Sequence, residues 1–241
     1  LVYAVRRLAA PANRPWQWLL AGCAVGFLPW LHQRFVFTAA VLGLVALGRW
    51  LRARPRFPVT LAIAPALAGG LALLGYNLWL YGTPWQNPQD HAGFNGLAGA
   101  LNGAAGLLLD AQWGLWIVAP VTILAVAALP WWRRADPRTF WLALVAVVPY
   151  LALVAAYKVW WGEWGPPARY LVPVVPLAAA PLGAWLAGAR WPGWLAAALL
   201  WGWGAMLTAI GYLDPQRFYH HPDGVNKLVS VVSGWLGVDL G

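Results

Sequence analysis

The sequence has few charged residues, few acidic ones and almost no sulfur. Of its 241 residues, 10% are charged and 61% are hydrophobic, with one cysteine and one methionine. A soluble domain carries about 25% charged residues, so this shortage excludes an ordinary water-exposed surface. The single cysteine, Cys23, lies in an apolar segment and excludes a disulfide framework or a cysteine metal site. The sequence opens at Leu1 without an initiator methionine, and we expect it to begin inside a longer protein.

Apolar segments long enough to cross about 30 Å of hydrocarbon recur along the chain. We expect seven of them, at 15–31, 35–53, 58–81, 114–132, 139–157, 170–188 and 192–212. The sequence therefore predicts an all-α, polytopic membrane helix bundle over residues 1–212, the C-terminal part of a larger membrane protein.

Two further segments have apolar residues at helical spacing and predict short helices in the outer membrane interface. One is the segment around 95–110. The other lies in the tail, 213–241, where the repeating residues are Val225, Leu228, Val229, Val232, Trp235 and Leu236.

The basic residues lie mostly in short loops between apolar segments, a pattern of membrane topology rather than of nucleic-acid binding. If seven segments alternate, one side receives Arg6, Arg7, Arg14, Arg49, Arg52, Arg54, Arg56, Arg133, Arg134, Arg138 and Arg190. The other side receives only Arg34, Lys158, Arg169, Arg217 and Lys227. The positive-inside rule places the N-terminus in the cytoplasm and the tail outside. All acidic residues except Asp136 then lie outside, where we expect any polar chemistry.

The stretch Tyr157–Pro176, YKVWWGEWGPPARYLVPVVP, places three charged residues at a predicted membrane edge. Charges are costly there and indicate function. Arg169 could direct two N–H donors onto a phosphate, with Lys158 as a second positive charge. The alternative is an ordinary interfacial arginine that pairs with Glu163 or a lipid headgroup.

Most of the twenty tryptophans lie near segment ends, as in the aromatic belts that anchor membrane helices. Trp160, Trp161 and Trp164 share a loop with charges and could contact a sugar or a lipid. Glu163 and Asp110 are candidate acids or bases, with a salt bridge or a helix-end role as the alternative. Asp90-His91 and His220-His221 are more typical of solvated loops than of metal sites. No metal, nucleotide fingerprint or cofactor is expected.

Four segments in order, AGCAVGFLPWLHQR, YNLWLYGTP, LLLDAQWGLWIVAPV and WWGEWGPPARYLVPVVPLAAAPLG, resemble one known family. They are similar to the C-terminal part of bacterial glycosyltransferases of the dolichyl-phosphate-mannose–protein mannosyltransferase-like superfamily. The resemblance covers roughly residues 15–212. It implies an enzyme of the hexosyltransferase type in the bacterial plasma (inner) membrane, which takes its sugar from a polyprenyl-phosphate donor at the outer face.

The resemblance also implies site residues. The family's Gly-Pro-Arg-Tyr run is matched by 167–170, so Arg169 and Tyr170, with Lys158, are expected to bind the lipid phosphate. The family's acidic-Gly-Leu segment is matched by 110–115. The expected substrate groove comprises Asp110, Trp113, Trp160, Trp161, Glu163 and Trp164. The family's catalytic carboxylate has no match here; we expect it upstream of Leu1 and this chain alone to be inactive.

Two other classes stay open. A membrane carrier or lipid flippase would need ionisable residues near the middle of its spans, which are nearly free of charge here. The absence of a matching catalytic base would also be consistent with a non-catalytic membrane scaffold. The expected partners are a polyprenyl-phosphate-linked sugar and membrane lipids, and no nucleic acid.

Overall fold

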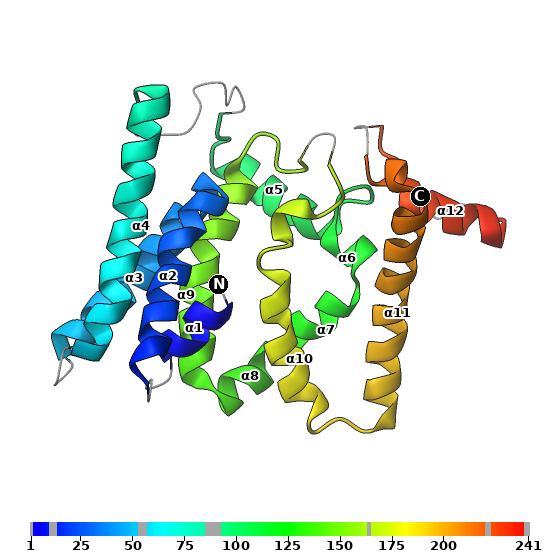
Figure 1. Cartoon of the computed structure of the whole chain (residues 1–241). Coiled ribbons are helices and arrows are strands. Elements are labelled where there is room, and N and C mark those ends of the chain that lie inside the picture. The colour runs from blue at the N-terminus through cyan, green and yellow to red at the C-terminus, as the bar shows by residue number, and fades with distance from the viewer. Residues whose placement is uncertain are drawn as a thin grey trace. The chain divides into compact units, whose positions relative to one another are not determined.

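The computed structural model describes residues 2–9, 14–52, 57–84, 93–162, 165–219 and 223–238. Over these ranges the regular elements are twelve α-helices and four short 3₁₀ helices (Figure 1). The only extended pairing among them is an isolated antiparallel bridge between Phe94 and Tyr157. The prediction of an all-α chain is confirmed for the described part.

The chain forms two units, and each contains two separate pieces of sequence. Unit 1 comprises Leu1–Gly93 and Asp136–Leu153, and unit 2 comprises Phe94–Ala135 and Val154–Gly241. One long helix, α9 (Pro137–Ala156), begins in unit 1 and ends in unit 2.

Unit 1 contains most of α9 and five elements from the first part of the chain. These are α1 (Val2–Ala9), α2 (Pro15–Leu31), the 3₁₀ helix η1 (Gln33–Phe35), α3 (Val36–Arg52) and α4 (Phe57–Tyr81). Proline at the first position of α2 fits the helix start because that position has no intrahelical use for an N–H.

Glycines bring α2 and α4 into direct backbone contact. A Cβ atom added at Gly22 would overlap the backbone of Ala62, and one added at Gly69 would lie 2.7 Å from the carbonyl oxygen of Gly26. Gly22 and Gly26 are four residues apart, the spacing that lets two apolar helices approach closely. The absence of side chains at these positions therefore sets the distance between the two helices.

The unit 1 part of α9 packs on α3. The hydroxyl of Thr38 donates to the backbone carbonyl of Ala146 at 2.9 Å in a buried contact. Nearby, the rings of Phe35 and Tyr150 stack with centroids 4.9 Å apart. A polar bond to α3 and a ring pair with η1 thus hold α9 at two points.

Unit 2 contains shorter helices around one long one. In chain order they are α5 (Leu97–Leu109), α6 (Leu115–Val118), α7 (Val121–Ala127), α8 (Leu129–Ala135), η2 (Arg169–Leu171), η3 (Val175–Ala178), α10 (Ala179–Leu186), α11 (Trp191–Leu213), η4 (Pro215–Phe218) and α12 (Lys227–Leu236). The end of α11 and the first turns of α12 share a buried apolar cluster of Leu207, Ile210, Leu228, Val229 and Val232.

The expectation of seven spans is wrong in number. Three helices in the described ranges are long and apolar enough to cross a membrane: Val59–Tyr81 within α4, then α9 and α11. The helices α2 and α3 have 17 residues each, a length of about 26 Å by helical rise, which is less than the roughly 30 Å hydrocarbon core.

Two of the expected spans are broken into pieces. Segment 114–132 is divided among α6, α7 and α8, and Pro120 stands at the start of α7. Segment 170–188 is divided among η2, η3 and α10, with Pro176 inside η3. Proline has no N–H to donate and its ring clashes with the preceding turn, so continuous α-helix is lost there.

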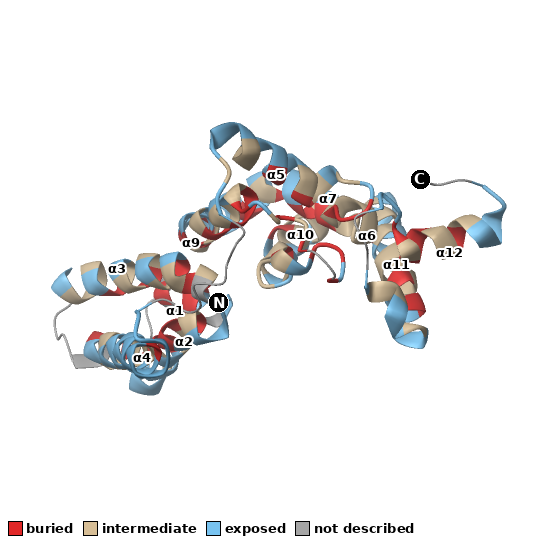
Figure 2. Ribbon diagram, turned by 90° about the horizontal axis from the view of Figure 1, so that it is seen from above, coloured by how far each residue is buried: buried red, intermediate tan, exposed pale blue. Residues whose placement is uncertain are grey.

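The three long helices differ in the share of their residues that is buried. The buried share is 11% for the spans in α4 and α11 and 39% for α9. Figure 2 shows exposed residues along most of α4. Such long apolar surfaces are unusual in a water-soluble fold.

Candidate functional site: the Arg169 loop and the 110–114 turn

The Arg169 loop, residues 157–162 and 165–171, follows the end of α9 and is anchored on α5 and on the residues just before it. The N–H of Asn95 donates to the carbonyl of Ala156 at 2.7 Å, and the ring of Phe94 meets that of Tyr157 edge to face. Trp160 is buried with 9% of its surface exposed. A Cβ added at Gly106 of α5 would overlap its ring, so a side chain there would displace the loop.

Two of the expected groove tryptophans are packing residues. Trp160 lies on α5, and Trp113 has 4% of its surface exposed. Trp161 is half-buried and meets Trp160 edge to face, with centroids 5.7 Å apart. Most of this aromatic surface therefore holds the loop in place.

Arg169 begins η2 and lies over two glycines. Cβ atoms added at Gly162 and Gly165 would lie 2.6 Å from its Nε and 2.5 Å from its Nη1. Its Nη2 donates to the hydroxyl of Tyr170 at 3.1 Å, and its Cζ lies 4.9 Å from the centroid of that ring. The guanidinium is exposed, and its contacts with Tyr170 and with the two glycines orient it for binding an anion.

The backbone just before Arg169 also helps to position that residue. Ala168, just before Arg169, has a φ of 53°, in the left-handed region that alanine seldom adopts. Its N–H donates to the carbonyl of Trp113 at 3.0 Å. The strained residue is thus fixed by a bond to the 110–114 turn.

The 110–114 turn is organised by Asp110. One carboxylate oxygen, Oδ1, accepts the N–H groups of Gln112 at 2.9 Å and Trp113 at 2.8 Å. The carbonyl of Asp110 accepts the N–H of Gly114 at 2.8 Å. The helix-end role is therefore present, and the turn links Asp110 and Trp113 to the Arg169 loop through Ala168.

A cavity of about 740 Å³ lies beside the loop within unit 2. Pro166, Pro167 and Ala168 line it, opposite residues of α7 and α11. Its two threonines turn their hydroxyls to backbone carbonyls, Thr122 to Ala119 and Thr208 to Gly204. The interior is therefore suited to hydrocarbon rather than to a sugar.

A buried polar pair that was not predicted from the sequence, Gln112 and Asn226, joins the tail to the same turn. Gln112 is 4% exposed, and its side chain donates to Oδ1 of Asp223 at 3.0 Å and accepts the N–H of Gly224 at 3.1 Å. Asn226 accepts the N–H groups of Leu228 and Val229 and caps α12. Asparagine just before an apolar helix is a recognisable capping signal, whereas nothing in the sequence marks Gln112.

Asp223 is held in its charged form. The N–H of Val225 donates to its Oδ1 at 3.0 Å. That bond, together with the charge of Lys227 and the hydrogen bond from Gln112, lowers the pKa of Asp223 below its usual value.

Of the remaining expected residues, the structure describes only Lys158. Lys158, the first residue of the turn after Tyr157, is exposed. Glu163, Trp164, Asp90-His91 and His220-His221 lie outside the described residues. Within the described ranges, no three His, Cys, Asp or Glu side chains gather where they could hold a metal ion.

Comparisons of the chain with protein-family models, with curated proteins and with solved structures give no match.

Proposed function

We propose that this chain is an integral membrane protein and forms the membrane part of a glycosyltransferase that uses a polyprenyl-phosphate-linked sugar. Three long apolar helices support the membrane assignment. The ordered motifs of the sequence support the family assignment. In this proposal the broken segments 114–132 and 170–188 cross the bilayer together with the three long helices. The arginine-rich loops then face the cytoplasm, and the Arg169 loop and the tail face the outside of a bacterial plasma membrane.

One observation carries the substrate class. The loop that fixes the guanidinium of Arg169 also forms a wall of an apolar cavity of about 740 Å³. A lipid phosphate needs both parts, a cation with directed donors and a space for hydrocarbon. We infer that the phosphate lies at Arg169 and the first isoprene units lie in the cavity.

The neighbouring residues have separate tasks in this proposal. The hydroxyl of Tyr170 accepts a bond from Arg169 and helps to position the guanidinium. Lys158 adds positive charge. Asp110 organises its turn through two backbone N–H groups, and we assign it a structural role rather than acid–base chemistry.

The test is the affinity of the purified chain for undecaprenyl phosphate, measured by native mass spectrometry. Arg169→Ala is expected to weaken binding about 10- to 100-fold, the effect of losing charge-assisted hydrogen bonds. Arg190→Ala, which removes another exposed arginine of unit 2, is the matched control and should bind as the wild type does. Undecaprenol, which lacks the phosphate, should bind weakly and equally to all three proteins.

A second variant keeps the charge and changes its position. Gly165→Val would push the guanidinium off its glycine support and should weaken binding with Arg169 still present. Equal affinity of the wild type, Arg169→Ala and Gly165→Val would disprove the phosphate site. Tight binding that persists without the phosphate would point to the cavity alone.

A further inference from the structure

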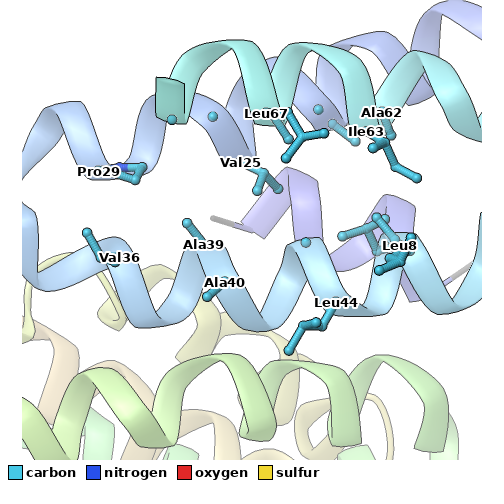
Figure 3. A pocket seen from close by; sticks show the side chains of 18 residues that line it. Leu8, Val25, Pro29, Val36, Ala39, Ala40, Leu44, Ala62, Ile63 and Leu67 are labelled. Carbon is cyan, nitrogen blue, oxygen red and sulfur yellow. The ribbon is translucent and has the colours of Figure 1, made fainter. Parts of the chain in front are cut away.

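We propose that a cavity between α2, α3 and α4 of unit 1 holds one acyl chain of an anionic phospholipid. This lipid site presupposes the membrane embedding proposed above and is independent of Arg169. The cavity has a volume of about 520 Å³, and all its lining residues are apolar. In Figure 3, Val25 of α2 and Leu67 of α4 lie above the space, and Ala39 and Leu44 of α3 lie below it.

The described side chains that line this space do not fill it. Glycines hold α2 against α4, and α3 presents Ala39, Ala40 and Gly43 to the pair. A Cβ atom added at Gly43 or Gly70 would meet nothing within 4 Å. An unfilled apolar cavity forfeits packing contacts, and water gains nothing there because it finds no polar partner. Hydrocarbon is the occupant that restores those contacts.

The dimensions match a chain from one leaflet. The lining follows α3 from Val36 to Leu47, a rise of about 16 Å, and half of the roughly 30 Å hydrocarbon core is one leaflet. Leu44 and Leu67 line the cavity and are 67% and 62% exposed. The cavity is therefore open along its side, where a lipid chain can enter from the bilayer.

The charges at one end of the cavity select the headgroup. Arg49 follows Leu47 by half a turn, and its Cζ lies 6.0 Å from the ring centroid of Trp18, so the arginine-bearing ends of α2 and α3 lie together. Arg14 and Arg52 are exposed at these ends. Among the described residues of unit 1, Asp136 is the only acidic one. This excess of guanidinium groups favours a headgroup with net negative charge.

The experiment fills the cavity from α3. Gly43→Leu places a side chain in the space, and Gly48→Leu, on the same helix and also free of neighbours within 4 Å, does not line it and is the matched control. The full chain is purified in detergent, and its Tm is measured with and without dioleoyl phosphatidylglycerol. The lipid should raise the Tm of the wild type and of Gly48→Leu by several degrees, and Gly43→Leu should abolish this shift.

Two further arms identify the ligand. Dioleoyl phosphatidylcholine should raise the Tm less than phosphatidylglycerol, and Arg52→Gln should reduce that difference. If Gly43→Leu does not fold, Gly70→Leu fills the cavity from α4, with Gly75→Leu as its control.

An equal phosphatidylglycerol shift in the wild type and the filled variant would overturn the lipid site. A wild-type dimer that Gly43→Leu dissociates would also overturn it, because a second copy would then occupy the cavity. Extraction of membranes with alkaline carbonate distinguishes a failure of the lipid site from a failure of the membrane assignment. Release of the chain from membranes would contradict the embedding, whereas a retained chain with an unchanged shift would contradict only the lipid site.

Discussion

The side-chain amide of Asn226 donates to the backbone carbonyl of Gln112 at 3.0 Å, and the side-chain amide of Gln112 donates to the carbonyl of Val225 at 3.1 Å. Each residue thus satisfies the backbone of the other's segment. Both side chains are buried, so water does not replace either bond. The pair fixes the tail segment, residues 223–236, to the turn that also supports the Arg169 loop.

Gln112→Ala should release the tail. The change removes the bonds to Asp223, Gly224 and Val225 together and should lower the free energy of unfolding by about 2–3 kcal/mol. Hydrogen exchange of the α12 amides, read by mass spectrometry, should become faster. Gln216→Ala, at an exposed position of η4, is the control and should leave this exchange unchanged.

Two substitutions of Asn226 separate its two roles. Serine keeps an oxygen that can cap α12 and loses the donor to Gln112, whereas alanine loses both. We expect Asn226→Ala to be less stable than Asn226→Ser by about 1 kcal/mol, the value of a cap. The readout is unfolding in a denaturing-detergent titration, and equal stability of the two variants would show that the cap contributes nothing.

Acidification should loosen the tail. The folded chain lowers the pKa of Asp223, chiefly through the N–H of Val225, so the stabilisation is complete above the unfolded value of about 3.9 and is lost as the pH falls through the lower folded value. Hydrogen exchange of α12, corrected for its intrinsic pH dependence, should therefore rise at and below about pH 4. Asp223→Asn should remove this pH dependence.

Hydrogen exchange is measured at α12 because the pKa of a second carboxylate is also lowered in the folded chain. Hydrogen bonds with Thr139 lower the pKa of Asp136 in unit 1. If the wild type and Asp223→Asn lose tail protection at the same pH, the effect belongs to another group.

Alanine should have opposite effects at two helical glycines of unit 2. In Gly106→Ala the new Cβ would overlap the ring of Trp160, and we expect a loss of about 1–3 kcal/mol, together with weaker binding of undecaprenyl phosphate as the Arg169 loop shifts. In Gly183→Ala the new Cβ meets nothing within 4 Å, and the better helix propensity should stabilise the chain by up to about 1 kcal/mol. Thermal unfolding of both variants gives the comparison.

Hydropathy alone was enough to predict where the long helices lie. The expected span at 139–157 corresponds to α9, Pro137–Ala156, and the one at 192–212 to α11, Trp191–Leu213. Length and apolar character determine such helices, and both can be read directly from the residues.

The broken segments could not be separated from the intact ones in this way. Pro65 and Pro149 lie inside α4 and α9, which continue past them, whereas Pro120 and Pro176 stand where helices are interrupted. Proline has the same local effect at all four positions. Whether the helix resumes depends on which neighbours satisfy the freed backbone groups, and that is a property of the tertiary structure.

Arg169 and its neighbours stay a prediction as a binding site, and the sequence accounts for only part of their arrangement. Its charged residues were visible because charge is scarce in this sequence, and the structure places Arg169 and Tyr170 together. The burial of Trp160 was not foreseen, because it depends on Gly103 and Gly106 of a helix that lies far away in the sequence. A tryptophan in a charged loop has the same neighbours in sequence whether it packs against a helix or binds a ligand.

The bond from Thr38 to Ala146 has a consequence for biosynthesis. Its two partners are 108 residues apart, and the whole first piece of unit 2, Phe94–Ala135, is made between them. During synthesis, the carbonyl of Ala146 is added about 5–20 s after Thr38, and until then the hydroxyl of Thr38 cannot form this bond. Neither unit can be completed by a nascent chain that stops before α9, so truncation there should leave α3 exposed to quality-control proteases.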